Sequence, residues 1–202
     1  NVGLFGIINE SSIVDLGLID SYVEGAGSGV GGLCGSAYTG TIRNCYVRNS
    51  VIIGGDNTGG LLGSNGTCTV ENSFVNTYVS GMRWAGLFIG SLNYGNIHNC
   101  YAAGELEQRS FCYNGGIVSY ASNGSISNCY STPTPMGIVG YVGTCNIVDT
   151  SSIVYNDLHY ELEHPIAFDT DTVTDLLQAL NIGVAYSNDP TWRLWKVDDS
   201  ET

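Results

Sequence analysis

The motif GGLCG at residues 31–35 is followed by IRNCY at residues 42–46, and both motifs recur along the chain, so together they define its fold. The first motif returns as GLFG at 3–6, GGLLG at 59–63, GLFIG at 86–90, GGIVS at 115–119 and GIVG at 137–140. The second motif returns as VENSF at 70–74, IHNCY at 97–101 and ISNCY at 126–130. When the repeats are counted at glycines 3, 32, 60, 86, 116 and 137, the step is 21 to 30 residues. A period of this size indicates one supersecondary unit per repeat, stacked on its neighbours.

Each repeat consists of short apolar runs, such as VII at 51–53 and LFI at 87–89, separated by Gly, Asn, Ser and Thr. Runs of β-branched and aromatic residues bounded by turn formers predict strands. A unit of this length is enough for one turn of a coil in which each strand pairs with its copy about 4.8 Å away. The sequence therefore predicts an all-β protein, a parallel β-helix (β-solenoid) of about six turns, right-handed because parallel crossovers are.

The repeated positions predict columns of identical side chains, one residue from each turn. The inward aliphatic column comprises Ile42, Val70, Ile97 and Ile126. A ladder of amide hydrogen bonds at a bend, where Asn tolerates the left-handed conformation, comprises Asn44, Asn72, Asn99 and Asn128, with Asp15 at the matching place in the first unit. The small residues after that bend are expected to point inward: Cys45, Ser73, Cys100 and Cys129. The glycine pairs are expected at a second corner, where Gly86 has Ala85 in place of its partner.

These motifs resemble the GLUG-motif repeat, a family of large bacterial cell-surface proteins that includes adhesin-like and IgA-protease-associated chains. The resemblance covers residues 1–150, with DTS at 149–151 standing where the last Asn-Cys-Tyr segment is expected. It implies a secreted or cell-surface repeat module, and it supplies no catalytic residues. Residues 1–150 are therefore expected to form the solenoid domain of a larger exported bacterial protein.

Residues 151–202 lack the repeat and are expected to form a C-terminal capping segment. Val173, Leu176, Leu177 and Leu180 have the spacing of an amphipathic helix, which predicts one short helix at about 172–181. The end of a solenoid exposes apolar core and unpaired backbone, so it needs a cover. Trp192 and Trp195, in an extended segment, suit that cover; a sugar-stacking role for them is the alternative.

Composition narrows the possible partners. The formal net charge is -13 with only 6 Lys+Arg, which disfavours nucleic acid and anionic membrane surfaces because both need clustered cations. The sequence contains no run of 18 apolar residues, so membrane insertion of this segment is not expected. The seven cysteines are expected to be buried thiols acting as small apolar residues, with a disulfide involving Cys68 as the alternative. No metal site and no cofactor are predicted, because the Cys and His spacing fits no common ligand motif.

An outward aromatic column is the candidate partner surface. Alternation along the strand places it opposite the cysteine column, and it comprises Tyr46, Phe74, Tyr101 and Tyr130. A second, shorter column would contain Tyr120 and Tyr141. Stacking that fixes the register is the alternative role for these rings.

The expected function is a non-catalytic adhesion or interaction module that binds a glycan or a host surface protein. Two alternatives remain. One is a rigid spacer that carries other domains of a surface protein. The other is a β-helix enzyme resembling a polysaccharide lyase, which would need cations and a carboxylate cluster around its substrate.

Overall fold

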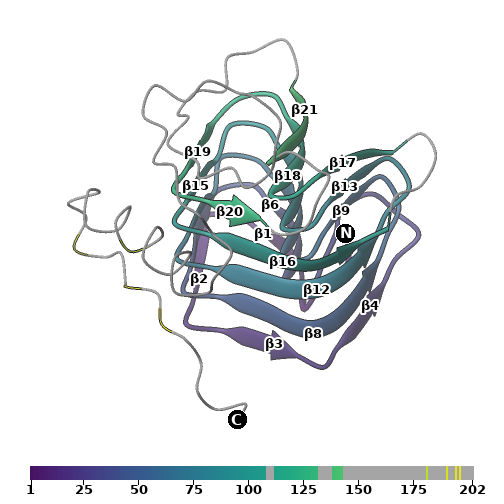
Figure 1. Ribbon diagram of the computed structural model, residues 1–202, viewed down its shortest axis with the longest axis horizontal. Coiled ribbons are helices and arrows are strands. Elements are labelled where there is room, and N and C mark those ends of the chain that lie inside the picture. The colour runs from purple at the N-terminus through teal and green to yellow at the C-terminus, as the bar shows by residue number, and fades with distance from the viewer. Residues whose placement is uncertain are drawn as a thin grey trace, which may run out of the picture.

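Four parallel sheets wind around a common core in the computed structural model of the chain (Figure 1). The structure describes residues 1–107, 112–131, 138–142, 181, 190, 194 and 196. Sheet A contains β5 (Val30–Gly31), β9 (Asn57–Gly59), β13 (Trp84–Gly86) and β17 (Tyr113–Gly115). Sheet B contains β1 (Phe5–Ile8), β6 (Cys34–Ala37), β10 (Leu62–Asn65), β14 (Ile89–Leu92), β18 (Val118–Ala121) and β21 (Val139–Val142).

The other two sheets complete each turn. Sheet C contains β2 (Ser11–Val14), β7 (Gly40–Arg43), β11 (Thr69–Glu71), β15 (Asn96–His98) and β19 (Ser125–Ser127). Sheet D contains β3 (Gly17–Ile19), β4 (Tyr22–Glu24), β8 (Tyr46–Ile53), β12 (Phe74–Ser80), β16 (Tyr101–Leu106) and β20 (Tyr130–Ser131). Every strand pairing is parallel, so the predicted β-solenoid is confirmed.

The number of turns is smaller than expected. Four turns carry a strand in each of the four sheets, from β5 through β20. The first turn has no sheet-A strand, only the isolated bridge between Val2 and Val30, and β21 is the one described strand after β20. The described residues thus form about four complete turns where about six were predicted, since the first copy lacks a sheet-A strand and only residues 138–142 of the last copy are described. The right-handed winding stays a prediction, and the expected 172–181 helix lies outside the described residues except for Asn181.

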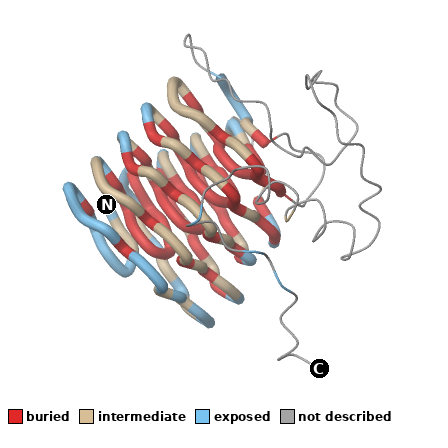
Figure 2. Tube along the Cα trace, turned by 90° about the vertical axis from the view of Figure 1, so that its left-hand side faces the viewer, coloured by how far each residue is buried: buried red, intermediate tan, exposed pale blue. Residues whose placement is uncertain are grey.

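The predicted aliphatic column forms the centre of the core. Val70 pairs in register with both Ile42 and Ile97, and Ile97 pairs with Ile126. All four side chains are buried, as is Ile13, which extends the column into the first turn. Figure 2 shows the turns stacked side by side, with buried segments running through the inner turns, while the first turn is mostly exposed.

The glycine motif is explained by a contact between sheets A and B. In Figure 1 the two sheets meet in a V that opens to the outside, seen between β17 and β18. A Cβ added at Gly59 would lie 2.1 Å from the Leu62 carbonyl oxygen, and one at Gly63 would lie 2.4 Å from the Val30 nitrogen. Such distances exclude any side chain, so the backbones of the two sheets approach each other directly.

The register corrects one assignment from the sequence. Gly86 pairs with Gly59 and Gly115, so it occupies the first glycine position of the motif, and Leu87 replaces the second glycine. The first position is kept because a Cβ at Gly86 would lie 1.9 Å from the Ile89 carbonyl oxygen. The corner therefore does not need two glycines in every turn.

Candidate functional site

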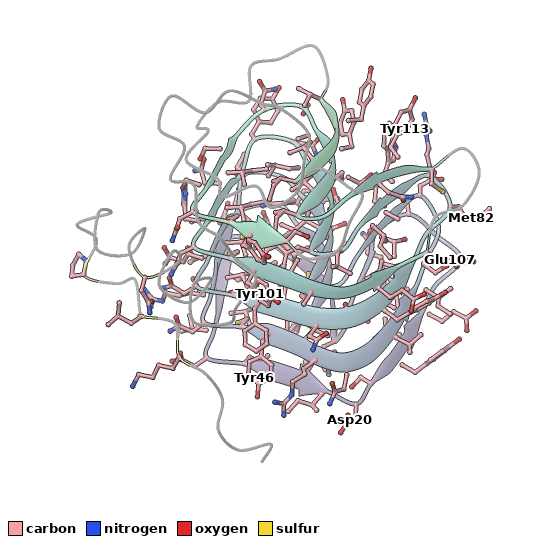
Figure 3. All side chains as sticks on the ribbon, in the orientation of Figure 1. Asp20, Tyr46, Met82, Tyr101, Glu107 and Tyr113 are labelled. Carbon is pink, nitrogen blue, oxygen red and sulfur yellow. The ribbon has the colours of Figure 1, made fainter. Side chains whose placement is uncertain are left out.

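The predicted aromatic column lies along sheet D, one ring per turn. Phe74 pairs in register with Tyr46 and Tyr101, and Tyr101 pairs with Tyr130. The Tyr46 and Phe74 rings stack with centroids 5.1 Å apart and planes 6° apart. Tyr101 and Tyr130 stack at 5.6 Å and 14°. Figure 3 shows Tyr46 and Tyr101 one above the other near the start of the sheet-D strands.

Exposure along this column is limited. Tyr46, Phe74 and Tyr101 are half-buried, and Tyr130 is only 3% exposed. Three of the four predicted residues therefore keep part of their ring surface exposed, whereas the prediction that Tyr130 faces outward is wrong, because its ring is buried and stacks on Tyr101. The stacking alternative and the binding alternative remain compatible for the other three.

The predicted asparagines occupy the bend between sheets C and D, all in the left-handed region with φ between 47° and 56° including Asp15. Asn128 Nδ2 donates to Asn99 Oδ1, and Asn99 Nδ2 donates to Asn72 Oδ1, each at 2.7 Å. Asn44 Nδ2 donates to Asp15 Oδ1, also at 2.7 Å. The amides of Asn44, Asn99 and Asn128 thus donate toward the preceding turn, so each of these side chains both bonds to a neighbour and holds the bend.

The ladder is interrupted once. Asn44 Oδ1 is buried and accepts no hydrogen bond from any described residue, so the ladder has two parts, Asp15 with Asn44 and Asn72 through Asn128. Backbone hydrogen bonds still cross the gap, because Asn44 N donates to Glu71 O at 3.2 Å. The four asparagines are thus structural, as predicted, although not one continuous row.

The cysteine column points inward, as predicted. Cys45, Cys100 and Cys129 are buried, and each Sγ donates to the carbonyl two residues before it at 3.1 to 3.3 Å. All six described cysteines are free thiols, so the disulfide alternative fails for Cys68. Burial raises the pKa of the Cys68 thiol to about 12. Burial, together with the neighbouring Cys129, also raises the pKa of Cys100 well above its ordinary value. Protonated, buried thiols are poor nucleophiles and poor metal ligands.

A second aromatic group lies where sheets A and B meet. We call it the corner cluster: Trp84 and Tyr113 from sheet A, and Tyr120 and Tyr141 from sheet B. Trp84 stacks on Tyr113 at 4.8 Å and 19°, and Tyr120 stacks on Tyr141 at 5.9 Å and 12°. The two stacks touch, with Trp84 4.8 Å from Tyr120 and Tyr113 5.0 Å from Tyr141.

The sequence revealed only half of this cluster. The column of Tyr120 and Tyr141 was expected and is confirmed by their register. Trp84 and Tyr113 were missed, because a contact between two different columns depends on the angle at which two sheets meet. Arg83 adds a cation at the rim, with its guanidinium carbon 5.2 Å from the Trp84 ring centroid. Figure 3 shows Tyr113 on the outside of β17.

Among the described residues, metal-ligating and charged side chains form no cluster comparable to the aromatic groups. Within the described parts of the chain, no three His, Cys, Asp or Glu residues gather closely enough to hold a metal ion. One ion pair is found there, between Arg43 and Glu71 at 3.9 Å. No helix in those parts has the length and apolar character needed to span a bilayer.

Comparison with known proteins matches one repeat of the chain to a described sequence motif. The family model described as the GLUG motif matches residues 26–52, which contain β5 through β7 and most of β8, and therefore almost one complete turn. Neither the curated proteins nor the solved structures gave a match. The matched turn pairs on both sides with turns of the same register and the same motif. Residues 26–52 therefore carry a GLUG motif, which corresponds to almost one turn of the β-solenoid, and the neighbouring turns repeat its sequence pattern.

Proposed function

We propose that this chain is a non-catalytic recognition module of an exported bacterial cell-surface protein, and that it binds a glycan or a host surface protein. The observation that carries the proposal is the set of outward aromatic rings held at fixed spacing on parallel strands, as in the 5.1 Å stack of Tyr46 and Phe74. Tyr and Trp side chains give large contact areas and lose little conformational entropy on binding. Rings already fixed by their neighbours lose less still.

The state of the thiols supports the non-catalytic part. The cysteines with the most strongly raised pKa, Cys68 and Cys100, are buried and bonded to backbone carbonyls. A thiol nucleophile would need a lowered pKa and access to the substrate. The lyase hypothesis gains no support either, since the described residues hold no cluster of carboxylates suited to calcium.

A rigid spacer is the second candidate, and sheet D favours it. β8, β12 and β16 pair over six or seven residues each, with one register shift between Asn76 and Thr77. Long in-register pairing makes a stiff rod, which is what a spacer requires. A spacer, however, needs these rings only for the stacking that fixes the register, and it gives no role to the ring surface that remains exposed.

Binding screens distinguish the two candidates. The chain would be applied to a glycan array and to immobilised extracellular-matrix proteins, and each hit would be measured in solution by calorimetry. The recognition proposal predicts saturable binding to at least one glycan or matrix protein. Absence of binding in both screens would refute it and leave the spacer. A Tyr46→Ala/Tyr101→Ala variant then tests whether sheet D carries the binding.

A further inference from the structure

The outer surfaces of sheets A and B face each other across the V and form a strip of side chains along the solenoid. On sheet A, Asn57 pairs in register with Trp84, and Trp84 with Tyr113. On sheet B the equivalent column is Ser64, Ser91, Tyr120 and Tyr141. We call these seven residues the corner strip. Ring contacts across the V, such as Trp84 to Tyr120 at 4.8 Å, show that its two sides meet.

The corner strip changes character along its length. At its N-terminal end it carries amide and hydroxyl groups, where Ser91 Oγ donates to Ser64 Oγ at 3.0 Å and Asn57 Nδ2 donates to Ser28 Oγ at 3.1 Å. At its C-terminal end it becomes aromatic. Tyr113 and Tyr141 are the most accessible of the rings, 45% and 43% exposed. Ser91 is itself buried, so the half-buried side chains of Asn57 and Ser64 are the hydrogen-bonding groups that lie next to exposed aromatic rings on this surface.

The strip is also uncharged. None of its seven residues carries a formal charge, although the chain holds 19 Asp+Glu and has a net charge of -13. Arg83, at the rim, has its charge over the Trp84 ring, an arrangement that stabilises the cation where it is. A surface of this kind suits an uncharged ligand, since the acidic chain as a whole repels anions and the strip supplies no carboxylate to attract cations.

We propose that the corner strip is a binding site for a neutral glycan; this inference rests on the recognition function proposed above. A sugar ring presents an apolar face of C–H groups and a rim of hydroxyls. The first matches the ring surface that Tyr113 and Tyr141 leave exposed beyond their stacks on Trp84 and Tyr120, and the second matches the phenol, serine and amide groups beside them. Successive rungs repeat at about 4.8 Å, close to the length of one pyranose unit, so a linear chain of sugars can lie along the strip.

Calorimetry with defined oligosaccharides tests the site. The probes are cellohexaose, mannohexaose, maltohexaose and chitohexaose as neutral chains, with a galacturonic acid hexamer as the anionic one. The variants are Trp84→Ala and Tyr113→Ala, the second chosen because its ring is largely exposed and its loss leaves the core intact. Tyr94→Ala is the matched control, since Tyr94 is 64% exposed and lies outside the strip. Thermal melts confirm that each variant is folded.

The expected result is binding of at least one neutral hexasaccharide, weakened about tenfold or more by Trp84→Ala and by Tyr113→Ala and unchanged by Tyr94→Ala. Equal affinity in the strip variants would overturn the site; if Tyr46→Ala/Tyr101→Ala then abolished binding, recognition would stand and move to sheet D. Binding of the galacturonic acid hexamer alone would overturn the neutral class. Binding of a matrix protein and no glycan would overturn the site while leaving recognition intact. No binding to any probe or matrix protein would overturn both.

Discussion

Replacing Asn99 by leucine tests the ladder at its centre. Asn99 is fully buried, donates to Asn72 Oδ1 and accepts from Asn128 Nδ2, both at 2.7 Å. Leucine removes both bonds, and each buried group left without its partner costs roughly 1–3 kcal/mol. The residue also has φ of 50°, where an ordinary side chain costs about 1–2 kcal/mol. The sum is roughly 3–8 kcal/mol, and the lower half of that range applies because Asn72 is half-buried.

Two further variants separate the causes. Asn99→Gly removes the amide but tolerates the positive φ, so it should cost about 2–4 kcal/mol, less than leucine. Asn44→Gly should cost under about 1 kcal/mol, because Asn44 Oδ1 accepts no hydrogen bond from a described residue and its one amide bond, to Asp15, is exposed. Urea unfolding followed by circular dichroism measures all three. An unchanged midpoint for Asn99→Leu, or equal losses at Asn99 and Asn44, would refute the ladder.

Two other predictions concern the close sheet contact and the buried thiols. Gly86→Ala places a Cβ 1.9 Å from the Ile89 carbonyl oxygen and should destabilise the chain by about 1–3 kcal/mol or more. The control is Gly27→Ala, which has nothing within 4 Å of its Cβ and should leave the thermal midpoint unchanged. Equal melting temperatures for the two variants would contradict the contact between sheets A and B. The pKa of Cys68 is raised from 9.0 to about 12, so the native state keeps a proton that the unfolded chain loses, and the stability present below about pH 9 should fall as the pH rises toward about 12. Urea unfolding at about pH 8 and about pH 10.5 should show a smaller fall for Cys68→Ala than for the parent, and identical falls would contradict the assignment.

The repeat made the core and the columns predictable, because residues one period apart must occupy the same place in successive turns. The aliphatic, asparagine, cysteine and aromatic columns all appear where the motif placed them. The same logic failed at Gly86, where a one-residue change in repeat length, with Leu87 in place of a second glycine, hid the true register. It also could not reveal that Asn72 does not donate to Asn44 Oδ1, since both positions carry the same residue in the same place of the repeat.

Contacts between different sheets could not be predicted from the sequence. Trp84 meets Tyr120 because sheets A and B fold back on each other at a glycine-lined corner, and periodicity within a column says nothing about the angle between columns. Close approach of the two backbones, together with the absence of side chains on the facing glycines, determines that angle. The candidate site therefore emerged from the structure, while the ladders that support it were predicted from the sequence.

Native mass spectrometry of the chain mixed with neutral hexasaccharides tests glycan recognition without turnover, because one spectrum reports both the complex and any cleaved product. We expect a saturable complex with intact hexasaccharide, lost in Trp84→Ala and Tyr113→Ala, and no shorter sugars after long incubation. Shortened or unsaturated sugars would show that the chain is an enzyme. A spectrum with neither complex nor product for any probe would contradict recognition of a neutral glycan by this solenoid.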